Sequence, residues 1–195
     1  MTLVAVLPRF PADRTLTITL SRRVEGRYVS VVLQETNRNL SLCKVEVYGY
    51  HAPTGENLAL RGKASQSTLY GNHFASNAID GNRNRDWNTC SHTGHTMNAW
   101  WRLDLGKTHR IFSVNVTNAP GVHTRLNGAE ICIGDSLDND GNNNPRCAVI
   151  STIAPGFTQG YDCRGMDGRY VTTVIPGQTE YLVLAEVEVY GSVLD

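Results

Sequence analysis

The chain of 195 residues is long enough for one domain of ordinary size and an additional segment. Its 18 basic and 18 acidic residues balance, and no basic stripe stands out, which argues against nucleic acid and anionic membranes as partners. Glycine and asparagine are abundant, long helical periodicity is absent, and no stretch approaches the length of a transmembrane helix. The composition therefore favours short strands joined by turns, without membrane insertion.

The first residues, MTLVAVLPRFPADR, do not read as a secretory signal peptide. Such a signal has a basic start, a longer apolar run and a cleavage site of small residues. Here Pro8, Arg9 and Asp13 interrupt the apolar run early. We therefore expect that no signal peptide is recognisable in this chain.

Residues 26–49 repeat residues 168–191 without a gap, and half of the aligned positions are identical. Both copies place alternating apolar residues on either side of a polar turn, which predicts a hairpin. The second copy ends a complete domain, whereas residues 1–50 bury too little surface for us to expect them to fold on their own. We expect residues 1–50 to be the truncated C-terminal remnant of a preceding copy of the domain. The alternative is an N-terminal extension that packs on the domain.

After a polar connector, residues 54–191 carry the pattern of an all-β domain. Within residues 111–117, for example, Phe112, Val114 and Val116 face one side and the polar residues between them face the other. Turns rich in glycine and asparagine separate the strands, as in a β-sandwich or jellyroll. The strand candidates are residues 100–105, 111–117, 129–133 and 182–190.

A series of short phrases in residues 54–191 resembles the F-type lectins, or fucolectins, best known from fish and eels. The phrases are ENLA and GKASQS within residues 56–67, SNAIDGN at 76–82, WWRLDL at 100–105, NGAE at 127–130, GNNNPRC at 141–147 and GRYV at 168–171. The resemblance implies a β-jellyroll with a structural calcium ion and a shallow sugar pocket between loops. It also implies an extracellular protein that recognises fucosylated glycans or glycoproteins, gaining strength through multivalency, for instance as a homo-oligomer.

The resemblance implies that calcium is held by Asn77, Asp80, Asn82, Thr89 and Glu186. The chemistry of the run from residue 77 to 82 agrees, because it supplies a carboxylate and two side-chain amides, and Ca²⁺ takes six to eight oxygen ligands. The alternative is an asparagine-rich turn that holds no metal.

For the sugar pocket, the resemblance implies a histidine and two arginines, and it places His92 and Arg125 on the histidine and the second arginine. Residues 119–124, APGVHT, replace the segment that carries the first arginine and an aspartate. Losing one charge-assisted hydrogen bond would cost about 1.5–3 kcal/mol. We expect His123 to serve as a substitute donor and Trp87 to offer an apolar face to the sugar methyl group.

The five cysteines contain no C-x-x-C pair, so a zinc ribbon is unsupported. The resemblance implies a disulfide between Cys147 and Cys163. The usual partner of Cys90 is replaced by Ala185, while the first copy of the repeat retains a cysteine there, Cys43. Cys90 is therefore either free or bonded to Cys43.

No arrangement in the sequence indicates an enzyme. The three carboxylates at residues 135, 138 and 140 share one loop rich in asparagine and glycine, and the Gly-x-Ser-x-Gly motif is absent. The leading hypothesis is a fucose-binding lectin with a structural calcium ion. The alternatives are a degenerate adhesion or structural module that has lost sugar binding, and a carbohydrate-anchoring module of a larger enzyme.

Overall fold

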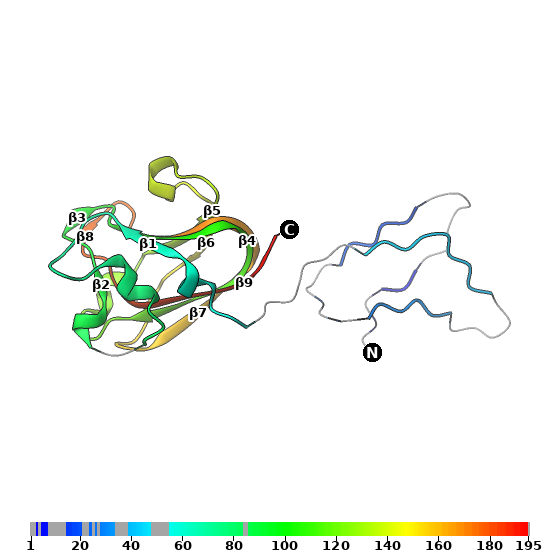
Figure 1. The fold of residues 1–195 in the computed structure, drawn as a ribbon, viewed down its shortest axis with the longest axis horizontal. Helices are drawn as coiled ribbons and strands as arrows, with labels where there is room; N and C mark the ends of the chain where they lie inside the picture. The colour runs from blue at the N-terminus through cyan, green and yellow to red at the C-terminus, as the bar shows by residue number, and fades with distance from the viewer. Residues whose placement is uncertain are drawn as a thin grey trace. The chain divides into compact units, whose positions relative to one another are not determined.

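The computed structural model describes residues 55–83 and 86–194, with His123 described only in its backbone. Of the preceding segment it describes residues 3, 5–7, 15–20, 24, 26, 28–33 and 39–47. The chain divides into two compact units, Met1–Tyr48 and Gly49–Asp195 (Figure 1). Among the described residues there is no helix of the length and apolarity needed to cross a bilayer.

The second unit consists of antiparallel strands and short 3-10 turns, which confirms the predicted all-β sandwich (Figure 1). The main sheet has the order β2-β9-β4-β7-β5-β6, with β1 also pairing with β4, and β3 and β8 form a separate pair. The strands are β1 (Lys63–Gln66), β2 (Ser91–His92), β3 (Thr96–Met97), β4 (Trp100–Asn118), β5 (Glu130–Gly134), β6 (Arg146–Val149), β7 (Thr158–Val174), β8 (Thr179–Glu180) and β9 (Val183–Val193). The turns are η1 (Leu58–Arg61), η2 (Ala75–Ile79), η3 (Trp87–Thr89), η4 (His123–Leu126) and η5 (Asp138–Gly141).

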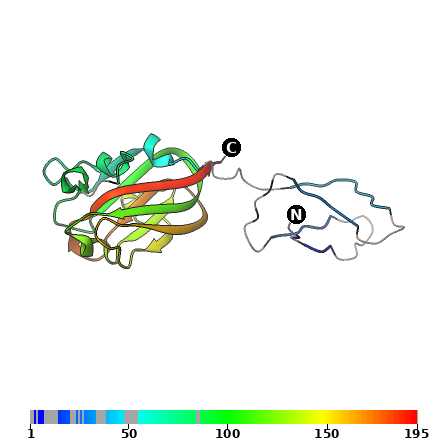
Figure 2. The same ribbon diagram turned by 90° about the horizontal axis from the view of Figure 1, so that it is seen from below.

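Strand β4 lies at the centre of the sheet, between β7 and β9 (Figure 2). The sequence predicted two strands here, at residues 100–105 and 111–117, and this division is wrong. Gly106, with φ of 81°, and the exposed Lys107 have the character of a turn. The structure instead accommodates them as an irregularity between Asp104 and His109 within one paired strand.

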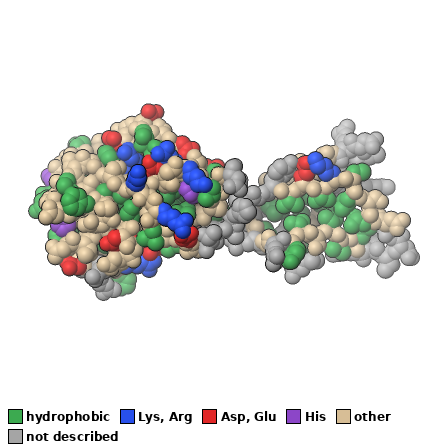
Figure 3. Space-filling view, viewed as in Figure 1, with side chains coloured by type: hydrophobic (Ala, Val, Ile, Leu, Met, Phe, Trp, Pro, Cys, Tyr) green, Lys and Arg blue, Asp and Glu red, His purple; other side chains and the backbone are tan. Residues whose placement is uncertain are grey.

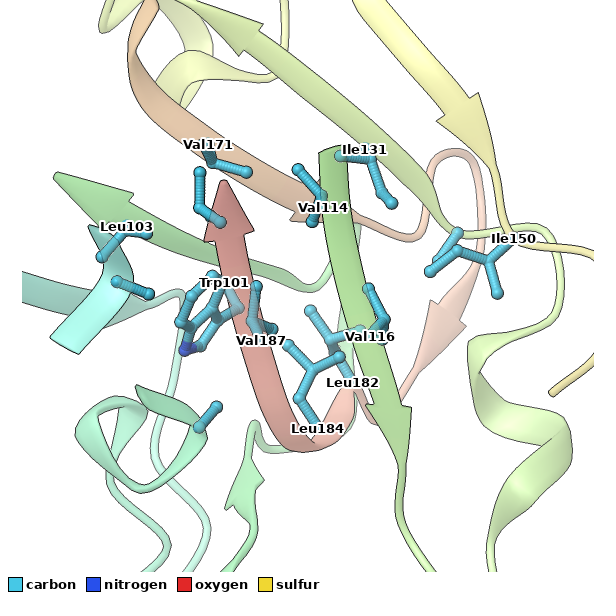
Figure 4. Packing of buried hydrophobic residues seen from close by; sticks show 14 of the residues in the cluster. Trp101, Leu103, Val114, Val116, Ile131, Ile150, Val171, Leu182, Leu184 and Val187 are labelled. Carbon is cyan, nitrogen blue, oxygen red and sulfur yellow. The ribbon is translucent and has the colours of Figure 1, made fainter. Parts of the chain in front are cut away.

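The core of the second unit lies between the layers of the sandwich. Trp101 and Leu103 of β4 point into it, and Leu184 and Val187 of β9 meet them there (Figure 4). The Trp101 indole N–H is satisfied, because it donates to the Ala75 carbonyl at 2.9 Å. This contact joins turn η2 to the core, and η2 begins the loop that leads toward the candidate site.

The cysteines pair as the resemblance implied. Cys147 of β6 and Cys163 of β7 form a disulfide with a Cα–Cα distance of 5.1 Å. Cys90 is free and buried within the second unit, and its alternative bond to Cys43 of the first unit stays a prediction. Cys90 and Ala185 lie in the same small buried cluster.

None of the described residues of the first unit is assigned to a helix or strand. The turn of the hairpin predicted over residues 26–49 lies outside the described residues, so the hairpin stays a prediction. The boundary between the two units lies between Tyr48 and Gly49. The origin of residues 1–50 as a remnant of a preceding domain stays a prediction.

Candidate functional site

A hollow of about 440 Å³ opens at the loop end of the second unit. Three of the four residues predicted for the sugar pocket, namely His92, Arg125 and Trp87, line it together. The side chain of the fourth, His123, lies outside the described part of the structure. The complete lining is Tyr70, Trp87, His92, Pro120, Gly121, Val122, Arg125 and Tyr181.

His92 lies at the floor of the hollow on the short edge strand β2, which pairs with β9. It is buried, and its Nδ1 lies 2.6 Å from the Thr93 carbonyl oxygen. Since a carbonyl only accepts, Nδ1 carries the hydrogen and Nε2 keeps a lone pair. Burial lowers the pKa of His92, and the nearby charge of Arg125 adds to this effect. The imidazole is therefore neutral and held in one tautomer.

Arg125 extends from turn η4 toward this lone pair, and its Nη1 donates to His92 Nε2 at 3.2 Å. Its Nε lies 3.9 Å from Glu180 Oε1. The guanidinium carbon lies 4.6 Å from the centre of the Tyr181 ring, a cation–π distance. An imidazole, a carboxylate and an aromatic face thus orient one guanidinium toward the hollow.

Aromatic rings surround His92. Tyr70 stacks on the imidazole with ring centres 4.5 Å apart, while Trp87 and Tyr181 meet it edge-on at 5.0 and 5.2 Å. Sequence reasoning identified Trp87 but missed Tyr70, Tyr181 and Glu180. Tyr70 follows the quoted GKASQS phrase and Glu180 lies in the turn of the repeat, so no motif marked either of them.

Residues 119–122, the first part of the segment that replaces the first arginine, form an apolar wall. Ala119 is buried beside Cys90 and Ala185, and residues 120–122 line the hollow. The wall therefore contributes no charged group, and Arg125 is the one arginine among the described residues that line the hollow.

Among the predicted metal ligands, Glu186 of β9 lies against the loop that carries Asp80. Its carboxylate is buried, Oε1 accepts from the Gly81 amide at 3.0 Å, and Oε2 has no hydrogen-bond partner. Burial, together with the charge of Asp80, raises the pKa of Glu186 to about 8. Asp80 Oδ1 accepts from the Asn82 amide at 2.8 Å, which curls the loop around the carboxylates. A buried carboxylate with an unpartnered oxygen next to a second carboxylate suits a cation.

The remaining predicted ligands offer oxygen atoms as well. Asn77 donates through Nδ2 to the Cys90 carbonyl, which leaves its amide oxygen available. Thr89 donates its hydroxyl hydrogen to the Asp86 carbonyl and keeps its lone pairs. In the described part of the chain, no three His, Cys, Asp or Glu side chains cluster in a way that could hold a metal. The predicted set contains only two carboxylates, and its oxygen donors fit the chemistry of Ca²⁺.

A second set of hydrogen bonds, besides the one between Gly81 and Glu186, joins the same loop to β9. Arg83 donates to both carboxylate oxygens of Glu188, and Asn115 of β4 donates to one of them. Burial alone would raise the pKa of Glu188, but these hydrogen bonds lower it. The loop that carries the predicted metal ligands is thus joined to β9 at both Glu186 and Glu188.

Comparison with known proteins identifies several relatives. A family model described as "NedA-like, galactose-binding domain" matches residues 77–173. Fucolectin-4 of Anguilla japonica is 48% identical over 151 residues, which cover 71% of this chain and 83% of that protein. An F-lectin structure from Morone saxatilis (striped bass) serum is 60% identical with a TM-score of 0.88 and covers 98% of this chain, hence most of residues 1–48, and 66% of that chain.

A third relative was solved with a ligand. The lectin domain of lectinolysin, complexed with Lewis B antigen, is 30% identical with a TM-score of 0.64. The match covers 71% of this chain and 99% of that domain. The sandwich predicted for residues 54–191 is thus shared with solved lectins.

Proposed function

The chain belongs to the F-type lectin (fucolectin) family, whose members are lectins and not enzymes, and from this premise we propose that it binds terminal α-L-fucose on glycans. The observation that carries the proposal is the contact between Arg125 and His92 inside a hollow walled by aromatic rings. A sugar needs directional hydrogen-bond partners and an apolar surface for its C–H faces. The hollow offers both.

Each group of the hollow has a role toward a 6-deoxy sugar. Arg125 donates charge-assisted hydrogen bonds to adjacent hydroxyls through the guanidinium hydrogens that His92 does not use. His92 sets the direction in which the Arg125 guanidinium points. Trp87 and the apolar wall of residues 120–122 receive the methyl group, and the hydroxyls of Tyr70 and Tyr181 are further polar partners.

With one arginine instead of two, a single site is expected to bind weakly. Useful avidity then requires several sites, on a homo-oligomer or on linked domains. We propose that the protein is secreted and acts in innate immunity by recognising fucosylated surfaces. The serum origin of the striped bass lectin and the Lewis B complex of lectinolysin support this.

We further propose that a structural calcium ion is held by Asn77, Asp80, Asn82, Thr89 and Glu186. When bound, the ion would supply positive charge to the buried carboxylates. Hydrogen bonds of the Gly81 amide and of Asp80 curl the loop. The chain then continues from this loop through η3 to β2. The loop thereby sets the positions of the pocket residues on η3 and β2.

The apolar wall favours one alternative, a degenerate module that has lost sugar binding. The test is retention of the full chain on fucose-agarose, with elution by free fucose. We expect retention that is lost in Arg125→Ala and His92→Ala and kept in Arg61→Ala, which removes an exposed arginine paired with Glu56. Failure of the unchanged chain to bind would favour the degenerate module.

A further inference from the structure

Apolar residues that are exposed in the first unit are buried at the matching positions of the second copy of the repeat, residues 168–191. Val29 and Val45 are 67% and 53% exposed, whereas their counterparts Val171 and Val187 are fully buried. Figure 3 shows hydrophobic side chains gathered on the surface of this unit. The same contrast holds for Val32 and Val174, Leu33 and Ile175, Leu40 and Leu182, Leu42 and Leu184, and Val47 and Val189.

The second unit shows what covers this surface in a complete domain. Residues 168–174 belong to β7 and residues 183–191 to β9, and both strands pair with β4, which lies between them. Leu103 of β4 is in register with Val171. Val116 of β4 is in register with Val187. The repeat therefore corresponds to two strands that flank a central one.

We propose that residues 28–33 and 39–47 are an interaction surface for a β4-like strand, supplied by the part of an F-type lectin domain that precedes β7. The partner presents alternating apolar residues, as Leu103 and Val116 do in β4, to the two flanking segments of the first unit. Backbone hydrogen bonds along both edges of the strand give the pairing its register, and burial of the valines and leucines stabilises it.

Two observations favour this occupant over a second copy of the chain. In a folded copy, β4 already pairs with β7 and β9 on both edges, so it offers no free edge. The striped bass match includes most of residues 1–48, yet about a third of that longer chain has no counterpart in this one. The inference is independent of sugar binding, because none of these residues lines the hollow.

The test is a fusion in which a second copy of residues 55–167 is joined directly to Gly26, so that the sequence continues as it does from Asp167 into Gly168. Hydrogen exchange is followed by mass spectrometry at residues 28–33 and 39–47, whose peptides are unique to the first unit. We expect these amides to exchange at least about 100-fold more slowly than in the unmodified chain. The matched control is the same fusion with Val29→Asp and Val45→Asp, which should show no slowing.

A second measurement covers the case in which the fusion does not fold. A synthetic peptide with the sequence of Trp100–Asn118 is added to the unmodified full chain, and we expect exchange at the same amides to slow at least about tenfold. The proposal is overturned if neither partner slows exchange, or if the Asp variants slow it equally. It is also overturned if the unmodified chain already protects these amides as a dimer, because a second copy would then be the occupant.

Discussion

Arg125 donates a hydrogen bond from Nη1 to Nε2 of His92 across 3.2 Å. The contact joins turn η4 to strand β2, which are 33 residues apart in sequence. The hydrogen bond requires an imidazole nitrogen that accepts. The direction of the Arg125 guanidinium therefore depends on the charge state of His92.

The first prediction concerns pH. Protonation would place a hydrogen on Nε2 and set two cations against each other, so fucose affinity should be constant above about pH 6.5 and fall below it. Burial lowers the pKa of His92 in the folded protein below its value in the unfolded chain. The stability that the neutral imidazole contributes is therefore fully present above the unfolded-state pKa, and it is lost as the pH falls through the folded-state pKa.

Titration calorimetry with fucose at a series of pH values would measure this. His73 and Glu180 also face the site, so His92→Gln is the control, since an amide accepts a hydrogen bond without titrating in this range. An affinity that falls equally in His92→Gln and in the unchanged chain would assign the effect to another group.

The second prediction concerns calcium and Glu186. Without metal, the raised pKa of about 8 means that the protonated carboxyl stabilises the fold. This stability is fully present below about pH 4.3 and is lost as pH rises through 8, by a few kcal/mol. Thermal unfolding in chelator should therefore show a falling Tm over this range.

Calcium should reverse the loss, because it neutralises the ionised carboxylates. In Glu186→Gln both the fall with pH and the gain with calcium should shrink. Equal Tm values with calcium and with chelator at about pH 8 would contradict a calcium site at Glu186.

The third prediction concerns Tyr181, whose ring lies under the guanidinium of Arg125. Tyr181→Leu keeps an apolar side chain but removes the cation–π contact, worth about 0.5–1 kcal/mol. Fucose affinity should fall by about twofold to fivefold, as measured by calorimetry. Leu137→Ala, which shortens an exposed side chain away from the hollow, is the control and should leave affinity unchanged.

The fourth prediction separates stability from binding. The Cys147–Cys163 disulfide closes a loop across a separation of 16 residues between β6 and β7, neither of which lines the hollow. Replacing both cysteines with serine should lower the free energy of unfolding by about 3 kcal/mol. Chemical denaturation would measure this, and affinity for fucose at about 25 °C should not change. A large loss of affinity in a folded double variant would show that the disulfide shapes the pocket.

The sequence predicted the fold class well because apolar and polar residues alternate within β4, and the apolar ones are those that the structure buries. It did not predict that β4 runs unbroken through Gly106, since pairing with β7 overrides a local turn signal. His92 and Arg125 were identified through family motifs. Tyr70 and Glu180 were not, because their roles depend on tertiary contacts with those two residues, which no local pattern encodes.

The central claim is that one imidazole and one guanidinium together hold a fucose residue. The most direct measurement is an NMR titration with methyl α-L-fucoside that follows the side-chain nitrogen resonances of His92 and Arg125. Both should shift and saturate together with one dissociation constant, while Arg61 does not respond. Saturable shifts elsewhere with these two unchanged, or no shifts at all, would contradict the assignment of the site.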